Sequence, residues 1–146
     1  MDPQKRCIFC KIAAKEDPKT TVLYEDDKVS VFKDIKPVSQ FHFLVISKEH
    51  IRNAAQLKLE HLPLLEHMEK IGKETIAKHE GKVSDCRIGF HWPPFNSVNH
   101  LHLHVIFPFN QINFFHKMIF PATRTPWFAP IDWIKLRVQS LGNNRL

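Results

Sequence analysis

The segment from Asn99 to Ile106 places the strongest constraint on the fold, because histidine and an aliphatic residue alternate in it three times. Successive side chains of a β-strand point to opposite faces of a sheet, so this period of two predicts a strand. Its three imidazoles would share one face. Leu101, Leu103 and Val105 would lie on the other face, against the core. The chain is therefore expected to build a sheet with one covered apolar face and one face that carries histidines.

Alternation and turn residues elsewhere predict an antiparallel sheet of roughly five strands. Besides residues 100–107, strands are expected at residues 29–34, 41–46 and 86–92. In the first of these, Phe32 and Asp34 should emerge on the same face. Strands in pairs, with few and uneven helices, favour an α+β fold over a doubly wound parallel fold.

Three helices are expected around this sheet. Apolar residues recur at helical spacing over residues 64–76, which predicts one long helix that covers a face of the sheet, and Pro63 is tolerated in its first turn. A short N-terminal helix is expected over Cys7 to Ala14, and a last helix near residues 131–139. The aromatic tail from Phe109 onward, which is interrupted by prolines, has no pattern that predicts its path.

Length and composition indicate one compact domain over residues 1–146, because 43% of the residues are hydrophobic and a chain of this size can bury one core. No stretch approaches the roughly 20 apolar residues of a membrane span, and the opening Met-Asp-Pro-Gln-Lys-Arg lacks the apolar run of a signal peptide. We therefore expect a soluble protein with no membrane partner, located in the cytoplasm and also in the nucleus. Its three cysteines suit a reducing compartment.

The formal net charge of +6 would favour polyanionic partners. Lysine and arginine are nevertheless spread along the chain and form no basic block of the kind found in nucleic-acid-binding tails. Charge alone therefore leaves DNA binding undecided.

A row of three imidazoles suits two kinds of chemistry, metal ligation and the transfer of an acyl or phosphoryl group. Imidazole serves both because it is neutral, basic and nucleophilic near pH 7. A second group of metal-ligating residue types is the pair Cys7-x-x-Cys10, which by itself fits either a zinc site or two small buried apolar side chains. The residues around these motifs must distinguish metal ligation from group transfer at the histidines, and a zinc site from buried side chains at the cysteines.

The motif at positions 100–106, with Ser97 three residues before it, resembles the signature of the histidine triad (HIT) superfamily. The upstream blocks that follow the order and spacing of its Hint branch are Cys7–Ile12, Phe32–Pro37 and His42–His50. The resemblance therefore covers a core of roughly residues 7–108.

One block narrows the resemblance within the Hint branch. Arg87-Ile88-Gly89-Phe90-His91 followed by Pro93-Pro94-Phe95 is similar to the third Hint paralogue, an adenosine 5′-monophosphoramidase, and less closely to aprataxin. Other Hint proteins carry an asparagine near His91, and the Gly-Gly that usually follows the motif is missing here. The C-terminal extension, about residues 109–146, departs most from the family.

The resemblance implies a HIT-like fold and a covalent mechanism. His102 would attack the α-phosphorus of an adenosine nucleotide and form a histidine-AMP intermediate, which water then hydrolyses. His104 would donate a hydrogen bond to a phosphate oxygen. Ser97 would bind the same phosphate or help to protonate the leaving amine. His100 and His42 would hold the tautomer and the ring orientation of the nucleophile.

The same resemblance implies a nucleoside site beside the histidines. Asp34 would accept hydrogen bonds from the two ribose hydroxyls. An apolar slot for the purine would be formed by Ile8, Phe9, Ile12, Phe32 and Ile35. Each of these apolar residues, taken alone, is more often part of an ordinary core. The implied substrate contacts also include Ser97, His100, His102 and His104.

Zinc-containing HIT proteins match this chain at Cys7, Cys10, His50 and His100, which implies a structural zinc with a tetrahedral Cys₂His₂ ligand set. Such an ion would tie the N-terminal segment to the sheet and leave His102 free for chemistry. No cofactor is expected for catalysis.

The function expected from the motif and its upstream blocks is hydrolysis of AMP from an amine or an acyl group, as in phosphoramidates, AMP-lysine adducts and acyl-adenylates. The main alternative is a nucleotide-binding module for protein interaction, with weak catalysis. Removal of AMP from DNA ends is disfavoured because aprataxin adds a C-terminal zinc finger, and this chain has only Cys86 after Cys10. Nucleic acid is therefore not an expected partner. A catalytic metal held by the histidine row is a further alternative.

The resemblance also implies a two-fold homodimer, in which the long helix and a neighbouring strand meet their symmetry mates. Trp127 and Phe128 would then either reach across an interface or cap the core of their own chain. The histidines at positions 61, 67, 79 and 116 are expected on solvent-facing surfaces of helices or loops. His91 has no role that the spacing assigns.

Overall fold

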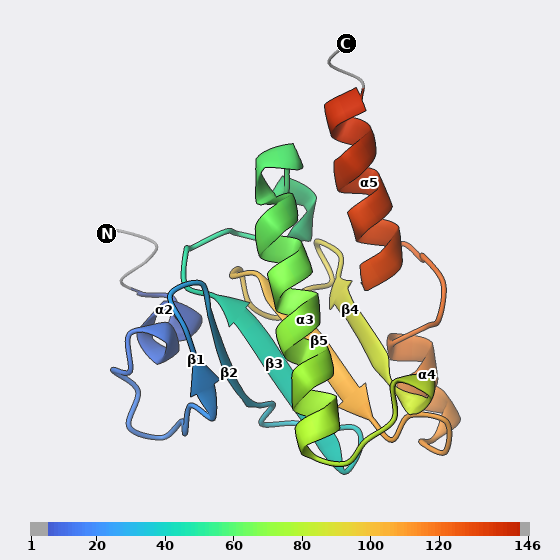
Figure 1. Ribbon diagram of the computed structural model, residues 1–146. Coiled ribbons are helices and arrows are strands. Elements are labelled where there is room, and N and C mark those ends of the chain that lie inside the picture. Colours follow the sequence, from blue (N-terminus) through green and yellow to red (C-terminus); the bar gives the residue numbers. More distant parts are fainter. Residues whose placement is uncertain (1–5, 144–146) are drawn as a thin grey trace.

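The computed structural model describes residues 6–143, in which a six-stranded sheet carries helices on both faces (Figure 1). The strands, all antiparallel to their neighbours, have the order β1-β2-β3-β5-β4-β6. They are β1 (Tyr24–Glu25), β2 (Val29–Lys33), β3 (Phe41–Ser47), β4 (Arg87–His91), β5 (His102–Phe107) and β6 (Phe128–Pro130). The helices are α2 (Ile8–Ala13), α3 (Leu62–Lys78), α4 (Phe114–Ile119) and α5 (Ile131–Asn143). Short 3₁₀ turns lie at Ala54–Gln56, Leu59–His61 and Val83–Asp85.

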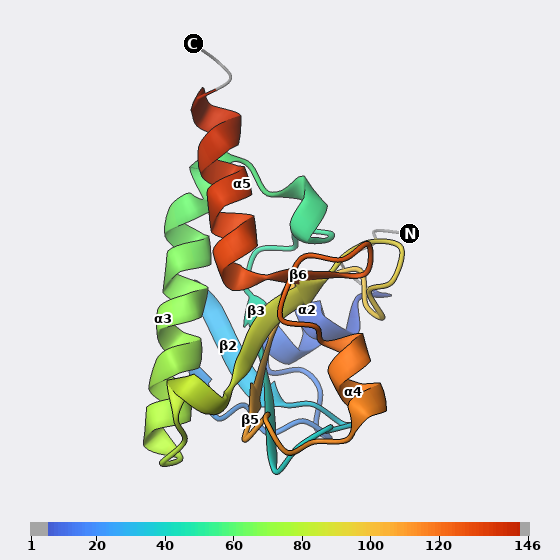
Figure 2. The same cartoon turned by 90° about the vertical axis from the view of Figure 1, so that its right-hand side faces the viewer.

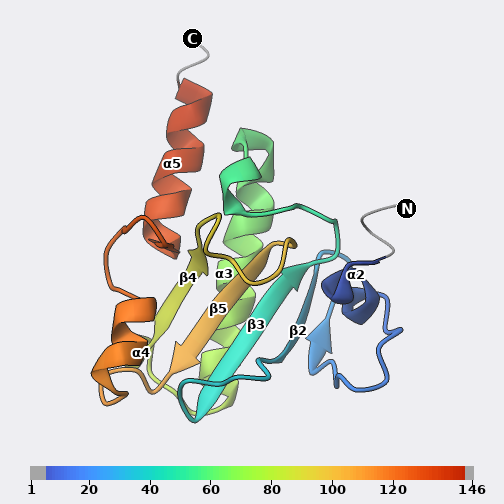
Figure 3. The same cartoon turned by 180° about the vertical axis from the view of Figure 1, so that it is seen from behind.

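The helices form two layers, one against each face of the sheet. α3 and α5 lie side by side on one face (Figures 1 and 2). α2 and α4 lie on the opposite face, at its two sides, as Figure 3 shows from behind. Within residues 6–143, no helix lies over the middle of that second face, where β3 and β5 run. This central strip of the sheet is the part that carries the histidine row.

The apolar face of β5 packs under α3. Leu101, Leu103 and Val105 are almost fully buried, in one cluster with Leu65 of α3. α3 presents an apolar face because its apolar residues recur at the helical period, and Pro63 lies in its first turn as expected. Burial of each leucine side chain stabilises the fold by roughly 1.5–3 kcal/mol. The predicted division of β5 into an apolar face and a histidine face is confirmed.

Two smaller apolar clusters flank the histidine face. On the α2 side, the buried residues are Phe9, Ile12, Phe32, Leu44 and Ile46. On the α4 side, they are Ile106, Phe109, Phe120 and Phe128. The second cluster consists mainly of residues from the C-terminal extension. The histidine row therefore lies between two apolar walls that come from opposite ends of the chain.

The expected α+β architecture is confirmed, but the sheet has six strands and several boundaries differ by a few residues. β2 ends at Lys33, and β5 begins at His102, so that His100 lies just before the strand. β6 has no signal in the sequence, because three residues that end in proline show no alternation. α5 begins at Ile131 as expected and continues to Asn143.

The C-terminal extension packs on its own chain. Phe128 is fully buried, and the Trp127 indole N–H donates to the carbonyl oxygen of Met118 at 2.9 Å, so both residues cap the core of their own chain. β6 pairs with the outer edge of β4, and α5 packs against α3. The homodimer that would use the long helix and a neighbouring strand stays a prediction. Within residues 6–143, no helix combines the length and apolar character needed to cross a membrane.

Candidate active site

His102 stands at the start of β5 with one ring nitrogen already engaged. Its Nδ1 lies 2.7 Å from the carbonyl oxygen of His100 and must donate to it, because a carbonyl can only accept. Nε2 of the neutral ring therefore carries the lone pair. His102 is 5% exposed, and its ring packs edge-on against Phe9, with centroids 5.1 Å apart. Burial lowers the pKa of His102, so that its ring is unprotonated and nucleophilic near neutral pH.

Two successive hydrogen bonds, from the Val38 amide to His42 and from His42 to His104, place the proton of His104 on Nε2. The Val38 amide donates to Nδ1 of His42 at 3.2 Å. The proton of the neutral His42 ring must then lie on Nε2, which faces Nδ1 of His104 at 2.9 Å. Because Nδ1 of His104 accepts this bond, the neutral His104 ring holds its own proton on Nε2. Burial keeps that ring neutral, since it lowers the pKa of His104 well below its usual range.

The two rings therefore present complementary Nε2 atoms, a lone pair on His102 and an N–H group on His104. Their centroids are 5.1 Å apart. Among the described residues, Nε2 of His104 is buried without a hydrogen-bond partner, a condition that costs about 1–3 kcal/mol. A phosphate oxygen would satisfy this donor while the phosphorus faced the lone pair of His102. This geometry suits nucleophilic phosphoryl transfer.

Asp34 lies beside the hydrogen bond that joins His42 and His104. Its Oδ2 is 3.3 Å from Nε2 of His42 and 3.9 Å from Nδ1 of His104. Its Oδ1 accepts the Lys36 amide at 2.8 Å. The prediction that Phe32 and Asp34 share the histidine face is confirmed, since Phe32 packs in the α2-side cluster of the same face.

Asp34, His42 and His104 are close enough to hold a metal ion, but their tautomers oppose it. A metal on Nε2 of His42 would require the proton to move to Nδ1, which faces the Val38 amide at 3.2 Å. Two N–H groups would then oppose each other. The alternative of a catalytic metal on the histidine row is therefore disfavoured.

His42 and His100 support His102 and His104 in a different way from the one predicted. The sequence predicts that both rings orient His102. In the structure, the main-chain carbonyl of His100 holds His102, and the ring of His100 points elsewhere. The ring of His42 contacts His104. Strand register is the reason, because His42 of β3 lies opposite Ile106 of β5, the next residue after His104 on that face.

Ser97 lies on the loop between β4 and β5, with its side chain exposed. The Asn96 side chain donates to the carbonyl oxygen of Val98 at 3.2 Å and to Oδ1 of Asn99 at 3.1 Å, which shapes the turn that carries the serine. The hydroxyl is thus accessible to a substrate close to the start of β5. Its predicted contact with the phosphate or the leaving amine stays a prediction.

The five residues predicted to form a purine slot divide into two groups. Phe9, Ile12 and Phe32 are buried in the α2-side cluster. Ile8 is 43% exposed at the start of α2, and Ile35 is 90% exposed directly after Asp34. An exposed isoleucine gains free energy when a ligand covers it. The slot therefore has a formed apolar wall and two aliphatic side chains available to a base.

The four predicted metal ligands converge on one point. Sγ of Cys7 lies 3.3 Å from Nδ1 of His100, and Sγ of Cys10 lies 3.1 Å from Nδ1 of His50. All four ligand atoms lie within 4.8 Å of one another. Cys7 also caps α2, because its sulfur accepts the Cys10 amide. The sequence motif and two distant histidines thus form one cluster.

The tautomer of His100 fits a metal ligand. Its Nε2 lies 2.6 Å from the carbonyl oxygen of Ser47 and must donate to it, so Nδ1 of the neutral ring is a lone pair. This lone pair faces Nδ1 of His50 at 3.2 Å and both cysteine sulfur atoms. Two thiols and two imidazoles form a known structural zinc set, and a carbonyl on the outer ring nitrogen is the usual support of a zinc-bound histidine.

Two residues with no assigned role lie against His104. The ring centroids of His91 and Phe120 lie 4.9 Å and 5.2 Å from that of His104. Strand parity could have found His91, because it lies two residues after Gly89, which pairs with His104. Phe120 has no such signal, since it lies in the extension, outside any periodic segment.

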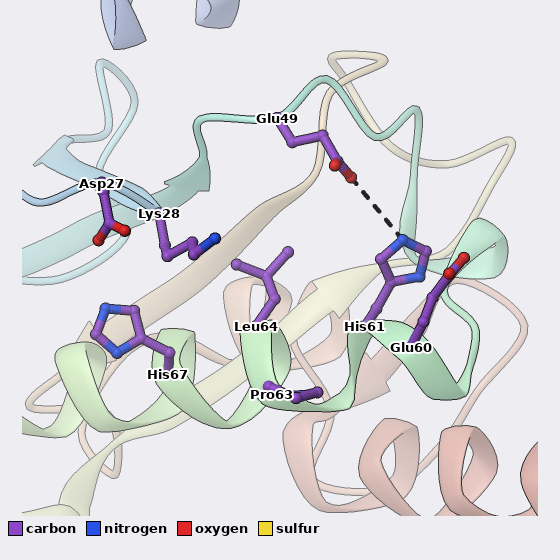
Figure 4. Close-up of a pocket in the computed structure, with 8 residues that line it drawn as sticks. All are labelled: Asp27, Lys28, Glu49, Glu60, His61, Pro63, Leu64 and His67. Atoms are coloured by element: carbon purple, nitrogen blue, oxygen red, sulfur yellow. Dashed lines mark ion pairs between the residues drawn. The ribbon is translucent and has the colours of Figure 1, made fainter.

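A separate pocket of about 320 Å³ lies away from the histidine row (Figure 4). Its lining consists of Asp27, Lys28, Glu49, Glu60, His61, Pro63, Leu64 and His67. Three carboxylates face a single lysine there, and the Glu49 carboxylate lies 3.9 Å from the His61 ring. The resulting excess of negative charge is unfavourable for binding a phosphate. The pocket contains no residue of the predicted nucleotide site.

His61, His67, His79 and His116 lie on helices or turns and are only partly exposed, so the prediction of solvent-facing positions is met in part. His67 Nε2 lies 2.6 Å from Oδ2 of Asp26. His79 donates through Nδ1 to the carbonyl oxygen of Thr75 at 2.9 Å. These contacts give both residues a local structural role.

The chain is similar to known proteins over most of its length. Residues 6–119 match the family described as "Scavenger mRNA decapping enzyme C-term binding". The chain is 40% identical over 127 residues to adenosine 5′-monophosphoramidase HINT3 of Xenopus tropicalis, which covers 86% of this chain and 82% of the relative. It is 50% identical over 101 residues to the bifunctional adenosine 5′-phosphosulfate phosphorylase/adenylylsulfatase HINT4 of Arabidopsis thaliana, covering 67% of each. A solved HIT family hydrolase from Clostridium thermocellum has a TM-score of 0.67 at 29% identity, covering 75% of this chain and 96% of that one.

Proposed function

Since the chain belongs to the histidine triad superfamily, we propose that it is an adenosine 5′-monophosphoramidase, which releases AMP from phosphoramidates, AMP-lysine adducts or acyl-adenylates. The observation that carries this proposal is the lone pair on Nε2 of His102 beside the unpartnered N–H of His104. The names of the two relatives support it, because both describe reactions of an adenosine 5′-phosphoryl group. A purely binding module would not need a nucleophile with its lone pair free.

The first chemical step transfers AMP to the enzyme. The lone pair on Nε2 of His102 forms a bond to the α-phosphorus, and the phosphorus–nitrogen bond to the amine breaks. The amine leaves with that electron pair and gains a proton, which the exposed Ser97 hydroxyl would relay from solvent. His104 donates its Nε2–H to a phosphate oxygen as charge develops there, which is worth about 2.7–4 kcal/mol of transition-state stabilisation.

The second step releases AMP. Water attacks phosphorus, the bond to Nε2 of His102 breaks, and its electron pair returns to the ring. The proton lost by water passes to solvent. Throughout both steps, Nδ1–H of His102 remains bonded to the carbonyl oxygen of His100, which stabilises the positive charge on the phosphorylated ring.

The nucleoside would lie between α2 and Asp34, with Ile8 and Ile35 covering the purine. The Asp34 carboxylate would accept bonds from the ribose hydroxyls. A comparison of ribose and 2′-deoxyribose phosphoramidates tests this placement. The wild type should prefer the ribose substrate, by kcat/KM, and Asp34→Asn should lose most of that preference. An equal preference in both proteins would place the ribose elsewhere.

Cys7, Cys10, His50 and His100 would hold a structural zinc. When bound, the ion would tie α2, and with it the apolar wall of the purine site, to the sheet. It would supply no chemistry to phosphoryl transfer.

Hydrolysis of a fluorogenic adenosine phosphoramidate by wild type and His102→Ala tests the proposed function. The variant should lose at least about 10³-fold in kcat, because no other group in the row has a free lone pair aimed at the substrate. His61→Ala is the matched control, since it removes one imidazole in the separate pocket away from the row, and it should retain activity. Equal rates for wild type and His102→Ala would leave only nucleotide binding.

A further inference from the structure

The C-terminal extension reaches His104 and its partner His42 through one aromatic residue, Phe120. Phe120, just after α4, is 4% exposed. Its ring centroid lies 5.2 Å from that of His104, 5.6 Å from that of His42 and 4.8 Å from that of His91. These histidines belong to β5, β3 and β4. A single side chain from outside the motif therefore contacts three strands of the site.

We propose that Phe120 is a positioning residue of the reaction, which holds the His42–His104 pair in the orientation and the dry surroundings that keep the His104 proton on Nε2. This inference rests on the proposed function. It gives the C-terminal extension a direct part in catalysis, in addition to its part in the fold.

β4 fixes the backbone on both sides of the Phe120 ring. Nε2 of His91 donates to the carbonyl oxygen of Ile119 at 3.1 Å. Nε of Arg87 donates to the carbonyl oxygen of Phe120 at 3.0 Å. Both donors come from the strand next to β5, so the backbone at Phe120 cannot move away from the sheet without breaking a hydrogen bond to it. The contact is thus held by specific bonds as well as by apolar packing.

Water exclusion is the main effect that Phe120 can have on the pair. The charged or titratable groups that surround the pair are Asp34 after β2, His91 on β4, His102 on β5 and His116 on α4. Burial outweighs all of them and lowers the pKa of His42 to about 4. The Phe120 ring adds no charge and covers both imidazoles, so its removal would admit water to them.

Water beside His42 and His104 would change which ring nitrogen of each histidine carries the proton. A protonated His42 would carry a proton on Nδ1 as well, opposite the Val38 amide. That conflict would turn the His42 ring and free Nδ1 of His104, whose own proton could then lie on either nitrogen. The reaction would lose its donor to the phosphate, while the nucleoside contacts would be unchanged. We therefore expect a lower kcat with little change in KM.

The experiment compares Phe120→Leu and Phe120→Ala with Phe107→Leu. Phe107 is a suitable control because it is equally buried on β5 but packs in the main core on the other face. Nitrogen NMR of the imidazoles reports the tautomers of His42 and His104 directly. In the wild type and in Phe107→Leu, His104 should show the Nε2–H form throughout neutral pH. Both Phe120 variants should show mixed tautomers and titrate at higher pH.

Kinetics give the second readout. Phe120→Leu and Phe120→Ala should lose about 10- to 100-fold in kcat with little change in KM. Phe120→Tyr, which retains the ring, should keep most of the wild-type kcat. Phe107→Leu should lose thermal stability and keep its kcat. If Phe120→Leu and Phe107→Leu behave alike in stability, tautomers and kcat, Phe120 is only a core residue and the inference is overturned. If Phe120→Ala does not fold, the Leu and Tyr variants decide.

The two proposals fail in different ways. A wild type that releases no AMP overturns the proposed function and this inference with it. An active Phe120→Leu enzyme with wild-type tautomers at His104 overturns this inference alone.

Discussion

His42 makes the stability of this protein depend on pH by an amount that can be worked out. Burial lowers its pKa from an ordinary value of 6.5 to about 4, and Asp34 opposes this shift only in part. As the pH falls below 6.5, the unfolded chain binds a proton that the folded chain does not bind until about pH 4. The free energy of unfolding therefore decreases through this window. At 1.36 kcal/mol per pKa unit, the difference between the unfolded and folded pKa values of His42 corresponds to about 3 kcal/mol of unfolding free energy.

The variant His42→Gln removes this titration and retains an N–H donor toward Nδ1 of His104. Between pH 7 and pH 4, the wild type should lose about 3 kcal/mol more stability than the variant, because the remaining buried histidines titrate in both proteins. Urea unfolding followed by tryptophan fluorescence, at constant ionic strength, measures the difference. His61→Gln, in the separate pocket away from the histidine row, is the control and should follow the wild type. If wild type and His42→Gln lose the same free energy, burial does not hold His42 neutral down to about pH 4, and the tautomers derived from a neutral His42 ring are wrong.

Three further predictions concern other parts of the site. His104→Asn should lower kcat by about 10²–10³-fold with little change in KM, because it removes the donor to the phosphate; steady-state kinetics with an unchanged kcat would exclude that role. Gly89→Ala should destabilise the fold by about 1–3 kcal/mol, since a Cβ there would meet the Phe128 ring and lie 2.8 Å from the carbonyl oxygen of Ala129; an unchanged Tm would contradict the close packing of β4 against β6. The proposed zinc site predicts that Cys10→Ser lowers the zinc content and the Tm of the purified protein without changing the kcat of the folded enzyme, and equal zinc content in variant and wild type would refute the proposed ligand set.

The sequence predicts the parts of this fold that have a strong period. Alternation over residues 100–107 and helical spacing over residues 64–76 both arise from one-sided burial, so β5 and α3 could be assigned with their faces. The same parity places Phe32 and Asp34 on the histidine face. The Cys-His cluster and the nucleophile were predicted through the resemblance, because no spacing rule connects Cys7 to His100.

The remaining features depend on register and on tertiary packing, which leave no local signal. Nothing in the sequence indicates that the ring of His42 contacts His104 and not His102, because this depends on how β3 is aligned with β5. β6 and Phe120 belong to an extension without periodicity, and they reach the site because β4 binds both, β6 by strand pairing and Phe120 through Arg87 and His91. The tautomers of His42 and His104 are fixed by the Val38 amide, a main-chain group that no side-chain pattern can reveal.

Intact-protein mass spectrometry after rapid quenching of a slow adenosine phosphoramidate tests the central claim most directly. The account predicts a transient adduct with the mass of one adenylyl group, located by peptide mapping on His102, and no adduct in His102→Ala. Turnover without any adduct, or an adduct on another residue, would contradict it.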